Sequence, residues 1–212
     1  MNLPTKITFS RIIAIVIMVI TLMVLYFIGL ANPEFVIPNI GNSGINWLYF
    51  GLFIFFVLAS FTDFLDGYLA RKNNQVTDLG KFLDPVADKL LVNSMIIFLI
   101  VPAYYAHNGQ MNFSLWCALL LVARDIVVDA LRFIAAQKGV VIAANIFGKA
   151  KTVLEMIAVS LVLLNGWPFI YFDANWPVRI ADIFVYLATA ASVISGVIYV
   201  VKNKQAFANS EK

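Results

Sequence analysis

The sequence predicts an all-α, polytopic membrane protein with six transmembrane helices and a short N-terminal helix at the membrane surface. The chain has 212 residues, of which 62% are hydrophobic and only 13% are charged. An ordinary soluble domain carries about 25% charged residues, and one of this length could not bury so much apolar surface. A span needs about 20 apolar residues, so the composition allows roughly six spans and leaves no room for a sizeable extramembrane domain. Residues 1–212 are therefore expected to form a single integral-membrane domain.

The predicted spans are separated by residues that are typical of turns. Leu3 to Arg11 mixes apolar and basic residues, which is typical of a helix lying on the membrane surface. The apolar stretch that follows is longer than the core of a signal peptide, which favours an uncleaved first span. Asparagine, glycine and proline mark the breaks between the stretches. The six spans are expected at residues 12–31, 47–69, 83–106, 114–137, 152–171 and 180–201.

The basic residues predict the orientation of the chain. Most lysines and arginines fall at one set of span ends, whereas the opposite loops hold only Arg179. By the positive-inside rule, both termini are cytoplasmic in a multi-pass protein of the cell (plasma or inner) membrane. The net charge of +3 is too small to suggest nucleic acid as a partner. Cys117 and His107 are the single residues of their types, which excludes an internal disulfide and metal clusters built from cysteine or histidine.

Four aspartates lie at the facing ends of the second and third predicted spans: Asp63, Asp66, Asp84 and Asp88. Residues three or four positions apart share a helix face, so each pair projects to one side. Gly67 and Ala70 share the face of the first pair and leave room for a bulky ligand. Because the two spans are antiparallel and similar in length, the four carboxylates should meet near the cytoplasmic edge of the hydrocarbon core.

Four carboxylates at one level repel each other unless cations neutralise them. Hard oxygen ligands suit magnesium or manganese, and two such ions about 4 Å apart would suit phosphate-transfer chemistry. Two alternatives stay open at this point. The aspartates could be solvated residues of a loop outside the membrane, or they could line a cation or proton pathway. Transport sites usually lie near the midplane rather than at one end of the spans, which favours the metal site.

The aspartate segment resembles the signature of the CDP-alcohol phosphotransferase family, D-x-x-D-G-x-x-A-R-x8-G-x3-D-x3-D. All eight signature positions match: Asp63, Asp66, Gly67, Ala70, Arg71, Gly80, Asp84 and Asp88. The resemblance implies six spans, a cytoplasm-facing site and a transfer of phosphatidyl from a CDP-lipid to an alcohol, with release of CMP. It also implies dependence on magnesium or manganese.

Three further segments are similar to the branch of this family that forms phosphatidylglycerophosphate. They are residues 2–11, residues 124–132 and the G-K-x-K-T box at residues 148–152. Thr5 and Asp125 depart from that branch, in which Asn and Glu are usual at these positions. The resemblance implies CDP-diacylglycerol as the donor and sn-glycerol 3-phosphate as the acceptor, with the reaction taking place at the lipid bilayer.

Basic residues of these segments could bind the phosphate of the acceptor: Arg124, Arg132, Lys149 and Lys151. The last three are expected to converge beside the aspartates, although both lysines could instead be ordinary cytoplasmic anchors. Arg124 and Asp125 lie about 15 Å into the fourth span, where unpaired charge is costly, so they should face the bundle interior. Glu155 is expected to pair with Arg124 or with a lysine.

The resemblance also implies a role for each signature residue. All four aspartates are expected to hold the two metal ions, and Asp88 should take the proton from the attacking hydroxyl. Gly80 should permit a tight turn before the third span. The nucleotide end of the CDP-lipid is expected at Gly67, Ala70, Arg71 and Gly80, with Thr8 and Arg11 nearby.

Several alternatives to this assignment stay open. Within the family, the acceptor could be inositol phosphate, another alcohol or a second phospholipid. From other classes of protein, the chain could be a cation transporter or a structural membrane subunit. A homodimer is also open, and the sequence indicates no interface for it.

Overall fold

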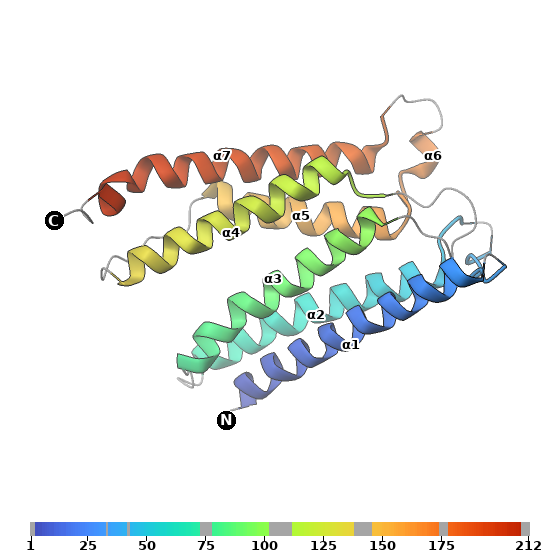
Figure 1. The fold of residues 1–212 in the computed structure, drawn as a ribbon, viewed down its shortest axis with the longest axis horizontal. Coiled ribbons are helices and arrows are strands. Elements are labelled where there is room, and N and C mark those ends of the chain that lie inside the picture. Colours follow the sequence, from blue (N-terminus) through green and yellow to red (C-terminus); the bar gives the residue numbers. More distant parts are fainter. Residues whose placement is uncertain are drawn as a thin grey trace. The chain divides into compact units, whose positions relative to one another are not determined.

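The computed structural model describes residues 3–32, 34–41, 43–72, 78–101, 112–137, 146–173 and 178–208. Over these residues the fold is helical and contains no β-sheet, which confirms the predicted all-α class (Figure 1). Six of the helices have 18–29 residues, and α6 has four. The helices are α1 (Leu3–Ala31), α2 (Trp47–Lys72), α3 (Asp78–Ile100), α4 (Leu115–Gln137), α5 (Ile146–Leu163), α6 (Ile170–Asp173) and α7 (Ile180–Ala208).

The chain divides into two compact units. The first comprises Met1–Asn112 with the short segment Val162–Asn165, and the second comprises Phe113–Leu161 with Gly166–Lys212. Helices α1 to α3 therefore belong to the first unit, and α4, α6, α7 and most of α5 belong to the second. That residues 1–212 act as one domain stays a prediction.

In the first unit, α1 packs against both α2 and α3, and these two also contact each other. The rings of Tyr49 on α2 and Phe98 on α3 lie with their centroids 5.6 Å apart. Fully buried apolar side chains from all three helices form the core, among them Ile15, Phe56, Met95 and Leu99. This packing determines which residues of α1 reach the aspartates of α2 and α3.

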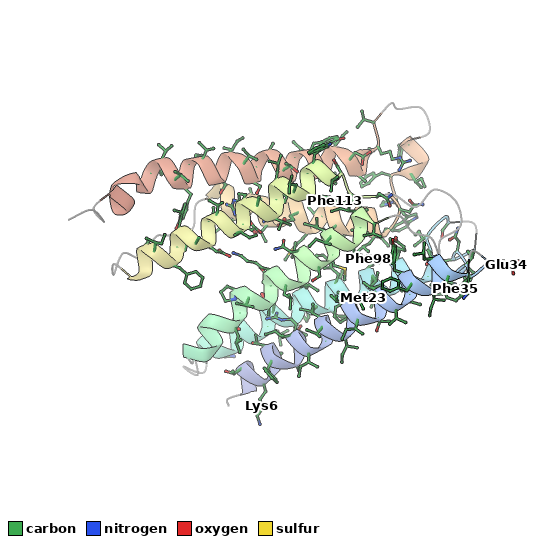
Figure 2. All side chains as sticks on the ribbon, viewed as in Figure 1. Lys6, Met23, Glu34, Phe35, Phe98 and Phe113 are labelled. Carbon is green, nitrogen blue, oxygen red and sulfur yellow. The ribbon has the colours of Figure 1, made fainter. Side chains whose placement is uncertain are left out.

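The N-terminal segment is not a separate surface helix, so this prediction was wrong. Residues 3–11 form the first part of α1, which continues without a break to Ala31. Pro4 falls in the first turn, where a missing N–H is tolerated, and neither glycine nor proline occurs between Thr5 and Ile28. The side chain of Lys6 points away from the helices (Figure 2).

Helix α2 begins where the sequence predicts, at Trp47. Asn46 caps it, because its Oδ1 accepts a hydrogen bond of 2.8 Å from the backbone N–H of Leu48. The Nδ2 of Asn46 also donates to the carbonyl of Ile37 at 2.7 Å, so the cap ties the preceding loop to the helix.

Helix α5 ends earlier than the predicted fifth span, at Leu163 rather than residue 171. The N–H of Gly166 donates to the carbonyl of Leu161 at 2.7 Å, and the N–H of Asn165 donates to that of Val162 at 3.1 Å. Asn165 has a φ of 53°, so the end of the helix is a Schellman motif with asparagine in the left-handed position. The end of the predicted third span, residues 102–106, lies outside the described residues.

In the second unit, α7 packs along α4, and the two helices run in the same direction (Figure 1). Small residues on α7 allow this approach. A Cβ atom on Gly196 would lie 3.1 Å from Cγ of Arg124, which is closer than ordinary packing permits. Thr189, Ser192 and Ser195 on α7 are buried polar residues of the same helix.

The surfaces of the long helices indicate a membrane protein. Two stretches of the described helices, Thr5–Ala31 and Ile180–Lys202, are long and apolar enough to cross a bilayer. Large apolar side chains are exposed along α1, α2, α4 and α7, for example Ile17, Leu58, Ile126 and Val197. An apolar surface of this extent would be unfavourable in water. Helices α3, α4 and α5 each carry several charged residues, which lower their own apolar character.

Candidate active site

One turn of α1 contacts both helices that carry the predicted metal ligands. The Nη1 atom of Arg11 lies 2.5 Å from Oδ1 of Asp63 on α2. The hydroxyl of Thr8 donates a hydrogen bond of 2.9 Å to Oδ1 of Asp84 on α3. Thr8 and Arg11 are three residues apart and therefore share a face of α1. Asp63 and Asp84 consequently lie at the same level, as the sequence predicts.

Arg11 and Thr8 are almost completely buried, whereas the aspartates that they contact are not. The side chain of Arg11 is 4% exposed and that of Asp63 is 36% exposed. Asp84 and Asp88 are half-buried and lie one turn apart on α3. The carboxylates thus keep an accessible side, while the residues that hold them are buried behind them.

The other aspartate of α2 is described only by its backbone. Asp66 lies in α2, three residues after Asp63, and its side chain lies outside the described part. The same is true of the side chains of Ala70 and Arg71. Among the side chains that are described, no three from Asp, Glu, His or Cys come together as a metal-binding group. The predicted four-aspartate metal site therefore stays a prediction.

The described side chains at the aspartate site have the chemistry that binds a hard divalent cation. Carboxylates of Asp63, Asp84 and Asp88 and the hydroxyl of Thr8 offer only oxygen. Such donors suit magnesium or manganese rather than zinc or copper.

The sequence predicts Gly80 in a tight turn before the third span. In the structure, Gly80 lies within the first turn of α3 instead. The sequence Thr77-Asp78 contains residues that favour a helix start, so the helix begins before the glycine. Gly67 lies within α2, directly after Asp66. Pro85, which the sequence reasoning did not use, lies inside α3 next to Asp84.

The second unit contains a network of four charged side chains, of which Asp125, Lys151 and Glu155 are buried. The ammonium of Lys151 donates to both carboxylate oxygens of Asp125, at 2.8 and 3.0 Å, and lies 2.6 Å from Oε2 of Glu155. The guanidinium of Arg124 donates to Asp125 at 3.0 Å and to Oγ of Ser195 on α7 at 2.8 Å. Two cations and two anions make the network neutral.

This network confirms two expectations about the charged residues of the fourth and fifth predicted spans. Asp125 is buried, as predicted, and Glu155 does pair with a lysine. Arg124 and Lys151 both contact Asp125 in this network, and their role at the acceptor phosphate stays a prediction. Lys149, by contrast, is exposed. Residues two positions apart in a helix point roughly 200° apart, so Lys149 and Lys151 leave α5 in different directions, and that both bind one phosphate stays a prediction.

The remaining cation of the predicted acceptor site, Arg132, lies over an aromatic ring. Its guanidinium carbon is 5.7 Å from the centroid of Tyr199 on α7, and its side chain is exposed. The sequence reasoning missed Ser195, Gly196 and Tyr199. A stripe of small and polar residues at helical spacing in an otherwise apolar span is the signal that could have identified this face of α7.

The aspartates and the acceptor cations belong to different units. Asp63, Asp84 and Asp88 lie in the first unit, whereas Arg132 and Lys149 lie in the second. That these groups serve one site stays a prediction.

Known proteins match this chain over nearly its whole length, and they belong to the family whose signature the aspartate segment resembles. The family model for CDP-alcohol phosphatidyltransferase matches residues 1–199. The CDP-diacylglycerol–glycerol-3-phosphate 3-phosphatidyltransferase of Bacillus subtilis is 39% identical over 212 residues, which cover 99% of this chain and 98% of that protein. The proteins of the same name from Rickettsia bellii and Mycoplasma pneumoniae are 34% and 36% identical, with 93% of this chain covered in each case and 93% and 86% of theirs. This chain therefore belongs to the CDP-alcohol phosphatidyltransferase family.

Proposed function

We propose that this protein transfers the phosphatidyl group of CDP-diacylglycerol to sn-glycerol 3-phosphate, giving phosphatidylglycerophosphate and CMP. The names of relatives that match almost the full chain support this reaction. The main structural support for the proposal is a pair of contacts from one turn of α1. Arg11 contacts Asp63 of α2 and Thr8 contacts Asp84 of α3, so the signature aspartates of the two helices lie at one level. Family membership argues against the transporter and the structural-subunit alternatives.

Members of this family use divalent metal ions. We assign the ions of this protein, two Mg²⁺ or Mn²⁺, to Asp63, Asp66, Asp84 and Asp88. When bound, such ions neutralise the diphosphate and polarise the phosphorus under attack. Thr8 and Arg11, expected beside the nucleotide, instead contact two of these carboxylates. We therefore assign them to orienting Asp84 and Asp63, while Gly67, Ala70, Arg71 and Gly80 keep their proposed place at the nucleotide.

Asp88 is the proposed general base. It lies one turn from Asp84 and is half-buried, so its carboxylate is partly accessible beside the other proposed metal ligands. In the reaction, a hydroxyl oxygen of the acceptor forms a bond to the phosphatidyl phosphorus and its proton passes to Asp88. The bond from that phosphorus to the bridging oxygen breaks, and CMP leaves with this oxygen.

Arg132 and Lys149 are the proposed ligands of the acceptor phosphate. Both side chains are exposed, whereas Arg124 and Lys151 are engaged in the neutral network. Arg132 lies near the end of α4, Lys149 lies near the start of α5, and the segment 138–145 joins these two ends. The two cations therefore lie toward the same end of the second unit, where each could form charge-assisted bonds to a phosphate.

An apolar cavity in the first unit supports a lipid donor. It has a volume of about 500 Å³ and lies between α1 and α3, lined by Val19, Met23, Ser94 and Phe98 among others. Figure 2 labels two of these side chains, Met23 and Phe98. Val19 is 11 residues from Thr8 along α1, a rise of about 16 Å. An acyl chain attached to a headgroup at the aspartates could reach this cavity.

The same proposal includes a multi-pass topology. Helices of 18–29 residues have lengths of about 27–43 Å, which approach or exceed the ~30 Å hydrocarbon core, so the six long helices are assigned as six spans. The positive-inside rule places the aspartates and both termini in the cytoplasm. Trp47 and Trp116 are exposed near the opposite helix ends, as interfacial tryptophans should be. A homodimer stays a prediction.

The reaction can be tested with purified protein, CDP-diacylglycerol, Mg²⁺ and a panel of acceptors, by measuring CMP release. We expect the fastest release with sn-glycerol 3-phosphate. Faster release with glycerol or inositol phosphate would show that the branch is misassigned, while the phosphotransferase assignment would stand. Absence of CMP with every acceptor would refute the proposed reaction itself.

A further inference from the structure

One face of α7 contacts two arginines of α4. Ser195 and Tyr199 are four residues apart and therefore share this face. Oγ of Ser195 accepts a hydrogen bond of 2.8 Å from Arg124, and the ring of Tyr199 lies 5.7 Å from the guanidinium of Arg132. Because the two helices run in the same direction, successive turns of α7 meet successive arginines of α4 (Figure 1).

The two arginines are held by different chemistry. Arg124 donates from Nη1 to Asp125 and from Nη2 to Ser195, so both of these nitrogens are already engaged. Arg132 instead lies over the ring of Tyr199, where a cation–π attraction holds it without using an N–H group as a donor to oxygen. A cation–π contact does not consume hydrogen-bond donors, and a planar guanidinium presents its N–H groups in the geometry that binds a phosphate.

We propose that Tyr199 is a positioning residue for the acceptor, which holds Arg132 in the orientation that binds the phosphate of sn-glycerol 3-phosphate. The inference rests on the proposed function. Tyr199 is only 5% exposed, so the ring is a fixed support, whereas Arg132 is exposed and would otherwise be free to rotate. The phosphate would meet a guanidinium that is already oriented and still has its hydrogen-bond donors.

The test is to remove the ring and measure both Michaelis constants. Tyr199→Leu should raise KM for sn-glycerol 3-phosphate about 2- to 30-fold, the range of a cation–π contact, with KM for CDP-diacylglycerol and kcat nearly unchanged. Tyr199→Phe keeps the ring and is the matched control, which should keep the acceptor KM close to that of the native protein. Tyr186→Leu removes an exposed tyrosine of the same helix and should have no effect.

A double-mutant cycle separates this inference from the proposed function. In an Arg132→Gln background, Tyr199→Leu should raise the acceptor KM no further. If Arg132→Gln alone leaves the acceptor KM unchanged, the proposed phosphate site is wrong. If Arg132→Gln raises KM but Tyr199→Leu does not, the positioning role is refuted and the phosphate site stands. An equal effect of Tyr199→Leu in both backgrounds would show a general packing role and would also refute the inference.

Because Tyr199 is buried, the folding of each variant is checked by thermal unfolding before the kinetics. If Tyr199→Leu does not fold, Tyr199→Met replaces the ring with a flexible apolar chain and tests the same contact. Its acceptor KM should rise by a similar factor, and an unchanged KM would again refute the positioning role.

Discussion

Replacing Lys151 with glutamine should destabilise this protein strongly, whereas the same change at Lys149 should not. The side chain of Lys151 is 5% exposed, and its ammonium lies within 3.0 Å of Asp125 and Glu155. Without it, the buried carboxylates of Asp125 and Glu155 would both lose the ammonium that they contact, and Asp125 would keep Arg124. Removing one partner of a buried ion pair costs about 3–5 kcal/mol, because the remaining charge stays buried.

The expected change in Tm follows from the size of the protein. A chain of 150–250 residues loses about 2–4 °C for each kcal/mol, so Lys151→Gln should lower Tm by about 6–20 °C. The double variant Lys151→Gln with Glu155→Gln restores a neutral network and should recover much of this loss. Lys149 is exposed, and surface changes usually stay within about 0.5 kcal/mol, so Lys149→Gln should leave Tm almost unchanged.

Kinetics on the same variants separate the two lysines by function. Charge-assisted bonds contribute roughly 1.5–3 kcal/mol, so Lys149→Gln should raise KM for sn-glycerol 3-phosphate about 10- to 150-fold. Thermal unfolding in detergent micelles and CMP release measure the two effects independently. Equal Tm values for the two single variants would refute the stabilising role of the network, and an unchanged acceptor KM for Lys149→Gln would remove this residue from the phosphate site.

Three further predictions concern the aspartate site, and one concerns topology. A strong chelator should abolish CMP release, and Mg²⁺ or Mn²⁺ should restore it; full activity in metal-free buffer would contradict the metal assignment. Asp88→Asn should lower kcat by about 10²- to 10⁴-fold if this residue is the base, and a near-normal kcat would place the base elsewhere. Thr8→Val removes the hydroxyl that donates to Asp84 and should raise the concentration of Mg²⁺ needed for half-maximal activity, whereas Thr8→Ser should not. A cysteine introduced at Gly44 should react with an impermeant thiol reagent in intact cells and one at Asn74 should not; the reverse pattern would refute the orientation.

Local patterns in the sequence were sufficient to predict the fold class and to identify the aspartate signature. A low content of charged residues and long apolar stretches predict helices wherever they occur, and residues three or four apart share a face in any helix. The pairs Asp63 with Asp66 and Asp84 with Asp88 could therefore be assigned to two helix faces before the structure was known. The beginning of α2 was also predictable, whereas the end of α5 was not, because it depends on the left-handed conformation of Asn165.

Only the tertiary structure decided which charged residues are paired and which are exposed. Lys149 and Lys151 have the same chemistry and lie two positions apart, and they differ because Lys151 faces Asp125 of α4 while Lys149 does not. Thr8 and Arg11 likewise have partners that the sequence of α1 does not indicate, since they contact Asp84 and Asp63. In each case the partner comes from another helix, far away in the sequence. The burial and pairing of a charge depend on which faces the packed helices turn toward each other, and no local pattern in one helix contains that information.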